Sequence, residues 1–236
     1  MLGYYGIYMD PTYILVVIGA IICLAASTNV NSTYGRYAKV RSMTNMTGAE
    51  VAKKLLYSNG VTDVQVGHVS GFLTDHYNPA NKVLNLSDAT YGAASVAAIG
   101  VAAHETGHAM QHANGYVPLK IRGALVPAVN IASYAAWPIL ILGLFFNSRT
   151  GLFMINLGIL LFSLAVLFQL ITLPVEIDAS RRGLRMLEAT GILGEEELKM
   201  AKKVLKAAAL TYVASAAAAI LQLLRIIILF GGRDRD

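Results

Sequence analysis

Long uncharged stretches alternate with shorter polar segments along the chain, and this pattern predicts membrane-spanning helices. No Asp, Glu, Lys or Arg occurs in 11–35, 123–148, 150–175 or 207–224. A helix needs roughly 20 apolar residues to cross a bilayer. Three runs meet this length directly, and the last meets it if Arg225 reaches the interface or faces protein. We therefore expect four transmembrane helices, near 11–30, 123–146, 151–173 and 207–230.

The polar segments between these runs predict a small region of mixed helix and sheet. The stretch "TGAEVAKKLLYSNG" (47–60) is an amphipathic helix that begins with the capping-box pair Thr47 and Glu50. "VTDVQVGHV" (61–69) and "KVLNLS" (82–87) alternate as strands do, and the turn-rich "TDHYNPAN" lies between them. "KVLNLS" is predicted either to pair with an extended substrate as an edge strand or to close a small sheet.

Three further helices follow from the same reasoning. Residues 89–113 are rich in Ala and other small residues and predict one helix that ends at Asn114-Gly115. Residues 175–190 predict a helix after the third span, stopped by Gly191. Three glutamates from Glu195 onward suit a helix N-terminus, and that helix is expected to continue into the fourth span.

Composition and charge placement agree with a multi-pass protein of the cell membrane. The chain is 56% hydrophobic and 14% charged, which is too apolar for an ordinary soluble domain. Fifteen of the 19 lysines and arginines lie in 28–122 or 174–206, and basic segments favour the cytoplasmic side. We therefore expect both segments inside and both termini outside. The net charge of +5 is explained by topology, so no nucleic-acid partner is expected.

The stretch "VAAHETGHAMQHA" (101–113) carries the strongest chemical pattern. His104, Glu105 and His108 form H-E-x-x-H, and on a helix the two histidines share one face and can bind one Zn²⁺. Glu105 then lies where it can serve as the general base for a metal-activated water. The single cysteine, Cys23, excludes a cysteine-based zinc site.

A catalytic zinc site needs a third protein ligand. His112 is nearest, but three consecutive helical turns would stretch the reach of one ion, and the longer H-E-x-x-H-x-x-G-x-x-H pattern is absent. Glu176 is the first charged residue after the third span, and two crossings return the chain to the side of His104. We therefore predict Glu176 as the third ligand, against the alternative of an interface carboxylate paired with Arg181 or Arg182.

The same stretch raises the question of an intramembrane site. The uncharged run 89–103 is shorter than a full span, and inserting it would place Glu176 opposite the first basic segment. We therefore predict that this helix lies at or near the cytoplasmic face.

At this point the sequence resembles a known family. "AAHETGHAMQHA" together with "LPVEIDASRR" (173–182), "LTDHYNP" (73–79) and "LNLSD" (84–88) is similar to the bacterial multi-pass membrane neutral zinc metallopeptidases, the YugP-like group. The resemblance covers nearly the whole chain from about residue 40. It implies that His104, His108 and Glu176 bind one Zn²⁺ per chain and that Glu105 is the catalytic base.

The expected protein is thus a mainly α integral membrane protein with about four transmembrane helices and a cytoplasmic zincin-like α+β catalytic region containing a short β-sheet. Its function is that of a zinc-dependent metalloendopeptidase acting on peptide or protein substrates, some of them membrane-associated. The alternatives are an intramembrane zinc protease of the site-2 type and a non-catalytic metal-binding scaffold. The segments expected are an anchor (1–30), the catalytic segment (31–122), two spans (123–173), a cytoplasmic helical segment with the third ligand (174–206), and a last span with its tail (207–236).

More distant zinc proteases that share H-E-x-x-H and a later Glu usually carry Asp four residues after that Glu, as a partner for a ligand histidine. Here that position is Ser180. We therefore expect the histidine to be held either by the Ser180 hydroxyl or by a carboxylate from elsewhere in the chain, such as Asp88. Candidates for stabilising the transition state are His76, Tyr77, Tyr91 and Arg181.

Overall fold

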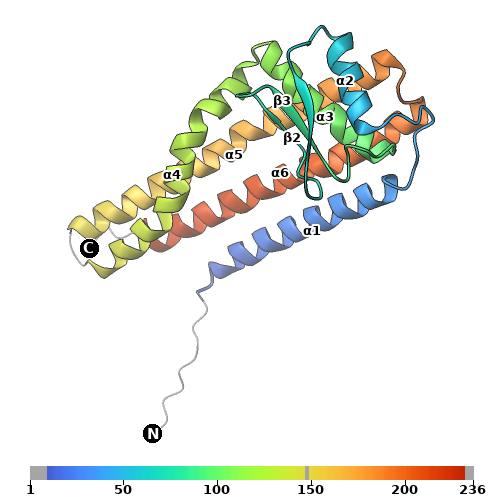
Figure 1. Cartoon of the computed structure of the whole chain (residues 1–236). Helices are drawn as coiled ribbons and strands as arrows, with labels where there is room; N and C mark the ends of the chain where they lie inside the picture. Colours follow the sequence, from blue (N-terminus) through green and yellow to red (C-terminus); the bar gives the residue numbers. More distant parts are fainter. Residues whose placement is uncertain (1–9, 147–148, 232–236) are drawn as a thin grey trace. The chain divides into compact units, whose positions relative to one another are not determined.

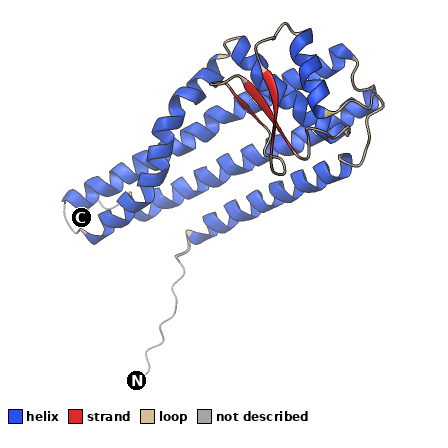
Figure 2. Ribbon diagram, viewed as in Figure 1, coloured by secondary structure: helices blue, strands red, loops and turns tan. Residues whose placement is uncertain are grey.

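The computed structural model describes residues 10–146 and 149–231, which form two compact units (Figure 1). Residues 26–124 and 171–213 make up one, called here the site unit, and the other described residues make up the second. Helices predominate throughout, and the strands are confined to one small sheet in the site unit (Figure 2).

Four helices among the described residues are long and apolar enough to cross a membrane: α1 (Tyr13–Tyr37), α4 (Val117–Phe145), α5 (Arg149–Thr190) and α6 (Glu195–Phe230). Their number confirms the pattern of uncharged runs. α6 continues from its glutamate-rich start into the apolar stretch, as expected. α5 differs from expectation because the third span and the helix 175–190 form one continuous helix through Pro174. Apolar helices tolerate an internal proline where neighbouring groups satisfy the freed carbonyl.

The sheet has three strands among the described residues: β1 (Gln65–Val69), β2 (His76–Asn78) and β3 (Val83–Ser87). The order is β1-β3-β2, with β1 parallel and β2 antiparallel to β3. β1 and β3 confirm the two expected strands, whereas β2 lies in the segment expected to be only a turn. β3 is the central strand, so of the two alternatives for "KVLNLS" the free edge is wrong and the strand that completes a small sheet is confirmed.

Helix α2 (Gly48–Ser58) forms as its sequence predicts. The Thr47 side chain accepts a hydrogen bond from the Glu50 backbone, and the Glu50 side chain accepts one from the Thr47 backbone. Val51 and Leu55 from this helix enter the core of the site unit.

Helix α3 (Val96–Ala113) lies at the centre of the site unit and is buried on several faces. Ile99 packs with α2 and α5, and Ala102 packs with Leu84 and Leu86 of β3. Small residues let neighbouring elements approach α3 closely, which explains its Ala-rich and Gly-containing sequence.

The expected start of α3 at residue 89 is wrong, because residues 89–95 form turns and Ser95 caps the helix. The carbonyls of Tyr91, Ala93 and Ala94 accept hydrogen bonds from the first two residues of α2 and from Ser42 before it, rather than from donors within α3. Small-residue composition predicted helix here, but these distant partners determine the backbone.

The second unit has its own apolar cluster of Leu140, Ile155 and Ile226. Arg225 faces protein groups there, since its guanidinium lies 3.5 Å from Asp10 Oδ2 and over the ring of Tyr13. The fourth uncharged run was expected to span if Arg225 either reached the interface or faced protein, and the structure shows the second arrangement.

Candidate metal centre

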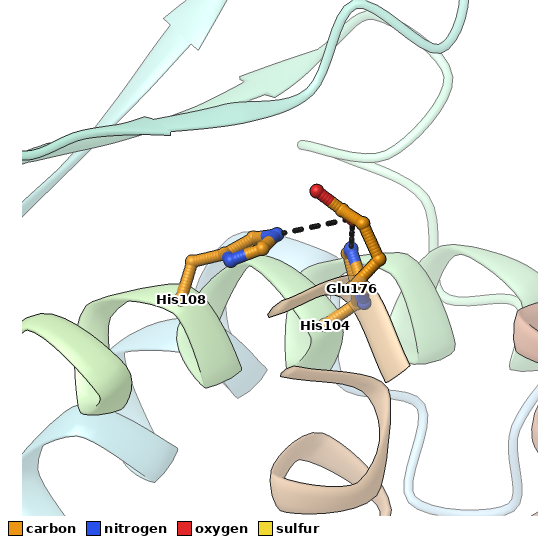
Figure 3. A group of neighbouring side chains, drawn as sticks. All are labelled: His104, His108 and Glu176. Atoms are coloured by element: carbon orange, nitrogen blue, oxygen red, sulfur yellow. Dashed lines mark ion pairs between the residues drawn. The ribbon is translucent and has the colours of Figure 1, made fainter. Parts of the chain in front are cut away.

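Helices α3 and α5 bring three potential metal ligands together in the site unit (Figure 3). Glu176 Oε2 lies 3.3 Å from His104 Nε2 and 3.4 Å from His108 Nε2. The three ligand atoms all lie within 4.8 Å of one another. His104 and His108 are one turn apart on α3, so their rings point the same way, and Glu176 reaches them from α5. His112, the alternative third ligand, bonds the Tyr77 hydroxyl at 2.8 Å instead.

Two glycines allow α3 and α5 to cross closely enough for this arrangement. A Cβ at Gly107 would lie 2.2 Å from the carbonyl oxygen of Ala179, and a Cβ at Gly183 would lie 2.6 Å from that of Ala103. Gly107 is therefore more than a spacer within H-E-x-x-H, because its missing side chain is where the backbone of α5 lies.

Neutral side chains hold both histidine rings through Nδ1. His104 Nδ1 lies 3.0 Å from Ser180 Oγ, and His108 Nδ1 lies 3.0 Å from Gln111 Oε1. An amide oxygen only accepts, so His108 carries its proton on Nδ1 and keeps the Nε2 lone pair free for a metal. Gln111 is itself fixed, since its Nε2 donates to the Val175 carbonyl at 2.8 Å and to Asp178 at 2.9 Å.

Glu176 is buried and uses its two oxygens differently. Oε1 accepts a hydrogen bond from Arg122 Nη1 at 3.0 Å, whereas Oε2 has no hydrogen-bond partner among the described residues. Burial acts to raise the pKa of Glu176, but the nearby imidazoles of His104 and His108 outweigh it and hold that pKa below its ordinary value. The carboxylate is therefore ionised, as a metal ligand must be.

These residues fit a zinc ion. Two imidazole nitrogens and one carboxylate oxygen are the donors that zinc takes in catalytic sites. Burial acts to lower the pKa of His108, but the carboxylates of Glu176 and Glu105 raise it, and the net direction is upward. The surroundings thus favour positive charge between the three ligands, which a divalent cation supplies.

A cavity of ≈ 230 Å³ within the site unit opens on two of the potential ligands, His104 and Glu176. Glu105, which is 7% exposed, lines it together with His104, Glu176 and Ser180. Most of the remaining lining is apolar and comes from α1, α3, α6 and the loop after β1: Val30, Tyr34, Leu73, Val101, Val204, Leu205, Ala208 and Ala209. Asp75, Thr211 and Tyr212 add polar groups to it.

The other predicted residues lie elsewhere. His76 bonds the Thr74 carbonyl and the Asn85 side chain, Tyr91 packs its ring against His68, and Arg181 is exposed. Of the two candidates for holding His104, the structure places Ser180 beside it. Asp88 instead pairs with His68 at 2.6 Å.

Three residues at the site were missed by sequence reasoning. Arg122 was counted only among the basic residues that indicate the cytoplasmic side. Its position does carry a signal, because it is the last charged residue before the uncharged run 123–148, just as Glu176 is the first after the run 150–175. Asp178 was assigned no role, yet it reaches the site through Gln111. Tyr212 lines the cavity from α6, and nothing in its sequence context marks it.

Comparison with known proteins agrees with this geometry. A family model described as "Putative neutral zinc metallopeptidase" matches residues 12–231. A curated relative from Bacillus subtilis (strain 168), "Putative membrane protease YugP", is 46% identical over 212 residues, which is 89% of this chain and 93% of the relative. No solved structure matches. Because the family model covers nearly the whole chain, the protein belongs to the neutral zinc metallopeptidase family that this model describes.

Proposed function

We propose that the protein is a membrane-embedded zinc metalloendopeptidase in which His104, His108 and Glu176 bind one zinc ion and Glu105 is the general base. The observation that carries the proposal is the convergence of the three ligand atoms beside a cavity that Glu105 also lines. Bound zinc would polarise the scissile carbonyl and lower the pKa of the attacking water.

The chain's own residues then have distinct tasks. Glu105 takes a proton from the attacking water and returns it to the leaving amine, as a buried carboxylate beside the reacting atoms can do. Ser180 and Gln111 keep the Nε2 atoms of the two histidines directed at the metal position. Arg122 holds Glu176 so that Oε2 is the oxygen that faces the histidines.

Helix α3 supports a site outside the bilayer core. It is not among the four helices that are long and apolar enough to span within the described residues. Residues of α2, the sheet and α5 pack against α3. Together with the basic residues of 28–122 and 174–206, this favours a catalytic site at the cytoplasmic face.

The cavity favours an apolar substrate side chain next to the scissile bond. Beyond the ligands and Glu105, its walls are mainly Val, Leu and Ala. Its ≈ 230 Å³ volume suits one side chain rather than a whole small-molecule ligand. Peptides with aliphatic residues at the cleaved position are therefore the substrates to try first.

Replacement of Glu105 tests the proposal. We expect Glu105→Gln to keep stoichiometric zinc and to lower peptide cleavage roughly 10²–10⁴-fold, the contribution that general base catalysis makes. Zinc content and cleavage of a broad peptide mixture are measured on the same preparation. Glu188→Gln, an exposed position on α5, is the control and should behave as wild type. A zinc-loaded Glu105→Gln protein with full activity would remove Glu105 from the mechanism, and zinc without any hydrolysis by the wild type would indicate a metal-binding scaffold.

A further inference from the structure

A basic groove lies between α1 and α6 of the site unit, apart from the metal centre. Its volume is ≈ 450 Å³, and its basic side chains are Arg36 of α1 and Lys203 and Lys206 of α6. The remaining lining consists of polar and small or apolar residues: Asn29, Ser32, Thr33, Tyr37, Ala207 and Leu210. No carboxylate lines the groove.

The three cations form no ion pair among the described residues, although Lys203 lies close enough to Glu196 to help lower the pKa of that carboxyl. Arg36, Lys203 and Lys206 are exposed, and no ion pair joins any of them to an Asp or Glu in the part of the chain that the structure describes. Lys199, one turn before Lys203, is by contrast paired with Glu195 and Glu196. Like charges held together in one groove repel each other, and an anion between them would relieve that repulsion.

The groove lies where two apolar helices become polar. Arg36 is the first charged residue after the uncharged run 11–35, and Lys206 is the last before 207–224. Leu210, 42% exposed, continues the groove toward the apolar part of α6. The sequence thus places the cations at the level of lipid headgroups, with apolar surface on the side where acyl chains would lie.

We propose that this groove binds the phosphate headgroup of an anionic membrane lipid. Arg36 presents a planar donor fork that matches phosphate oxygens, and the two lysines add point charges. The hydroxyl of Thr33 offers a further donor. Zwitterionic lipids carry the same phosphate but add a cation that these three residues would repel.

The groove and the catalytic cavity share two walls. Val30 and Tyr34 of α1 and Val204 and Ala208 of α6 line the cavity, while neighbouring residues of the same helices line the groove. A lipid held between Arg36 and Lys206 therefore ties together the two helices that form one side of the cavity. Anionic lipid should accordingly raise both the thermal stability and the peptidase activity.

Lipid binding is tested on the full-length Glu105→Gln protein, so that the result does not depend on peptidase activity. The protein in neutral detergent is titrated with phosphatidylglycerol or with phosphatidylcholine, and retained lipid is counted by native mass spectrometry. The variant Arg36→Gln/Lys203→Gln/Lys206→Gln should bind phosphatidylglycerol roughly 100-fold more weakly, and each single variant roughly fivefold more weakly. Unchanged zinc content and circular dichroism show that each variant is folded.

A control with the same loss of charge makes the test specific. Lys53→Gln/Lys54→Gln/Lys202→Gln removes three exposed lysines that do not line the groove and should bind lipid as the parent does. Equal losses in both triple variants would overturn the proposal in favour of diffuse attraction. Equal binding of phosphatidylcholine would overturn it as well. Saturation by inorganic phosphate or glycerol phosphate at the same concentration would assign the groove to a free anion rather than to a lipid.

Discussion

At the scale of single residues, the candidate metal centre is distinguished by how its potential ligands are held. Neutral Ser180 and Gln111 occupy the places beside the histidine rings, and Asp178 acts one step further out through Gln111. A neutral partner orients an imidazole but leaves it less electron-rich than a carboxylate would. The zinc affinity of this site should therefore depend on the hydrogen bonds that fix the rings.

Removing the hydroxyl of Ser180 tests this dependence. Ser180→Ala leaves His104 Nδ1 without its 3.0 Å partner, so zinc should bind roughly 10–100-fold more weakly. The dissociation constant is measured by competition with a chelator of known affinity. Ser180→Thr keeps the hydroxyl and should bind zinc nearly as the wild type does, and an unchanged constant in Ser180→Ala would show that the hydrogen bond does not hold the ring.

Arg122 should matter most when no metal is bound. Arg122→Gln removes the charged partner of Glu176 Oε1, and a hydrogen bond between charged groups contributes about 1.5–3 kcal/mol. Because the Arg122 side chain is 31% exposed, the loss should lie near the lower end of that range. We expect the midpoint of thermal unfolding of the metal-free protein to fall, and added zinc to restore most of it. Arg181→Gln, exposed on α5, is the control, and an equal fall in both variants would contradict a specific role for Arg122.

Sequence reasoning predicted the ligand set but not its supports, for a physical reason. H-E-x-x-H and the first charge after a span are local features, whereas the partners Arg122 and Gln111 depend on how α3, α4 and α5 approach one another. Ser180 could be predicted because it lies only four residues after Glu176 in the sequence. The ligand, base and Ser180 assignments remain predictions until zinc and activity are measured.

At the scale of elements, the crossing of α3 and α5 decides whether the site forms. Gly107 and Gly183 each face a backbone carbonyl of the other helix. Element boundaries were predicted well where local signals exist, as in the capping box of α2 and the Asn114-Gly115 end of α3. They failed at residues 89–95, where hydrogen bonds to Ser42 and to the start of α2 override composition.

Two glycines on the same helix offer a matched test of the crossing. A Cβ at Gly107 would lie 2.2 Å from the Ala179 carbonyl oxygen, whereas one at Gly100 would meet Ala201 Cβ at an ordinary 3.5 Å. Gly107→Ala should push α5 away from α3, lowering both zinc occupancy and the unfolding midpoint. Gly100→Ala should keep zinc and gain about 0.5–1 kcal/mol from helix propensity. Similar behaviour of the two variants would mean that α5 can shift without disturbing the ligands.

At the scale of the whole molecule, zinc should couple the catalytic site to the stability of the fold. A ligand that binds only the native state stabilises it by about 4 kcal/mol at 1,000 times its dissociation constant. Removal of zinc by a chelator should therefore lower the unfolding midpoint of wild type and of Glu105→Gln alike. His104→Ala, which has lost a ligand, should unfold at the same temperature with or without zinc. If the unfolding midpoint of the wild-type protein were the same with and without zinc, metal binding would not contribute to the stability of the fold.

The orientation in the membrane that we expect from the placement of basic residues can be tested on intact cells. Cys23 is the only cysteine, so after its replacement by Ser single cysteines can be introduced at Lys53 and Arg149. A thiol reagent that does not cross membranes should label position 149 and leave position 53 unlabelled until the cells are opened. The reverse pattern would place the catalytic segment outside.

The split of the metal ligands between α3 and α5 has a consequence for biogenesis. His104 and His108 leave the ribosome first, and Glu176 follows only after the whole of α4 and the apolar part of α5 have been synthesised. A nascent chain therefore carries two histidines without their carboxylate until its second and third apolar helices have been made. Under the proposed function, hydrolysis would therefore wait for chain segments that are synthesised after the two histidines.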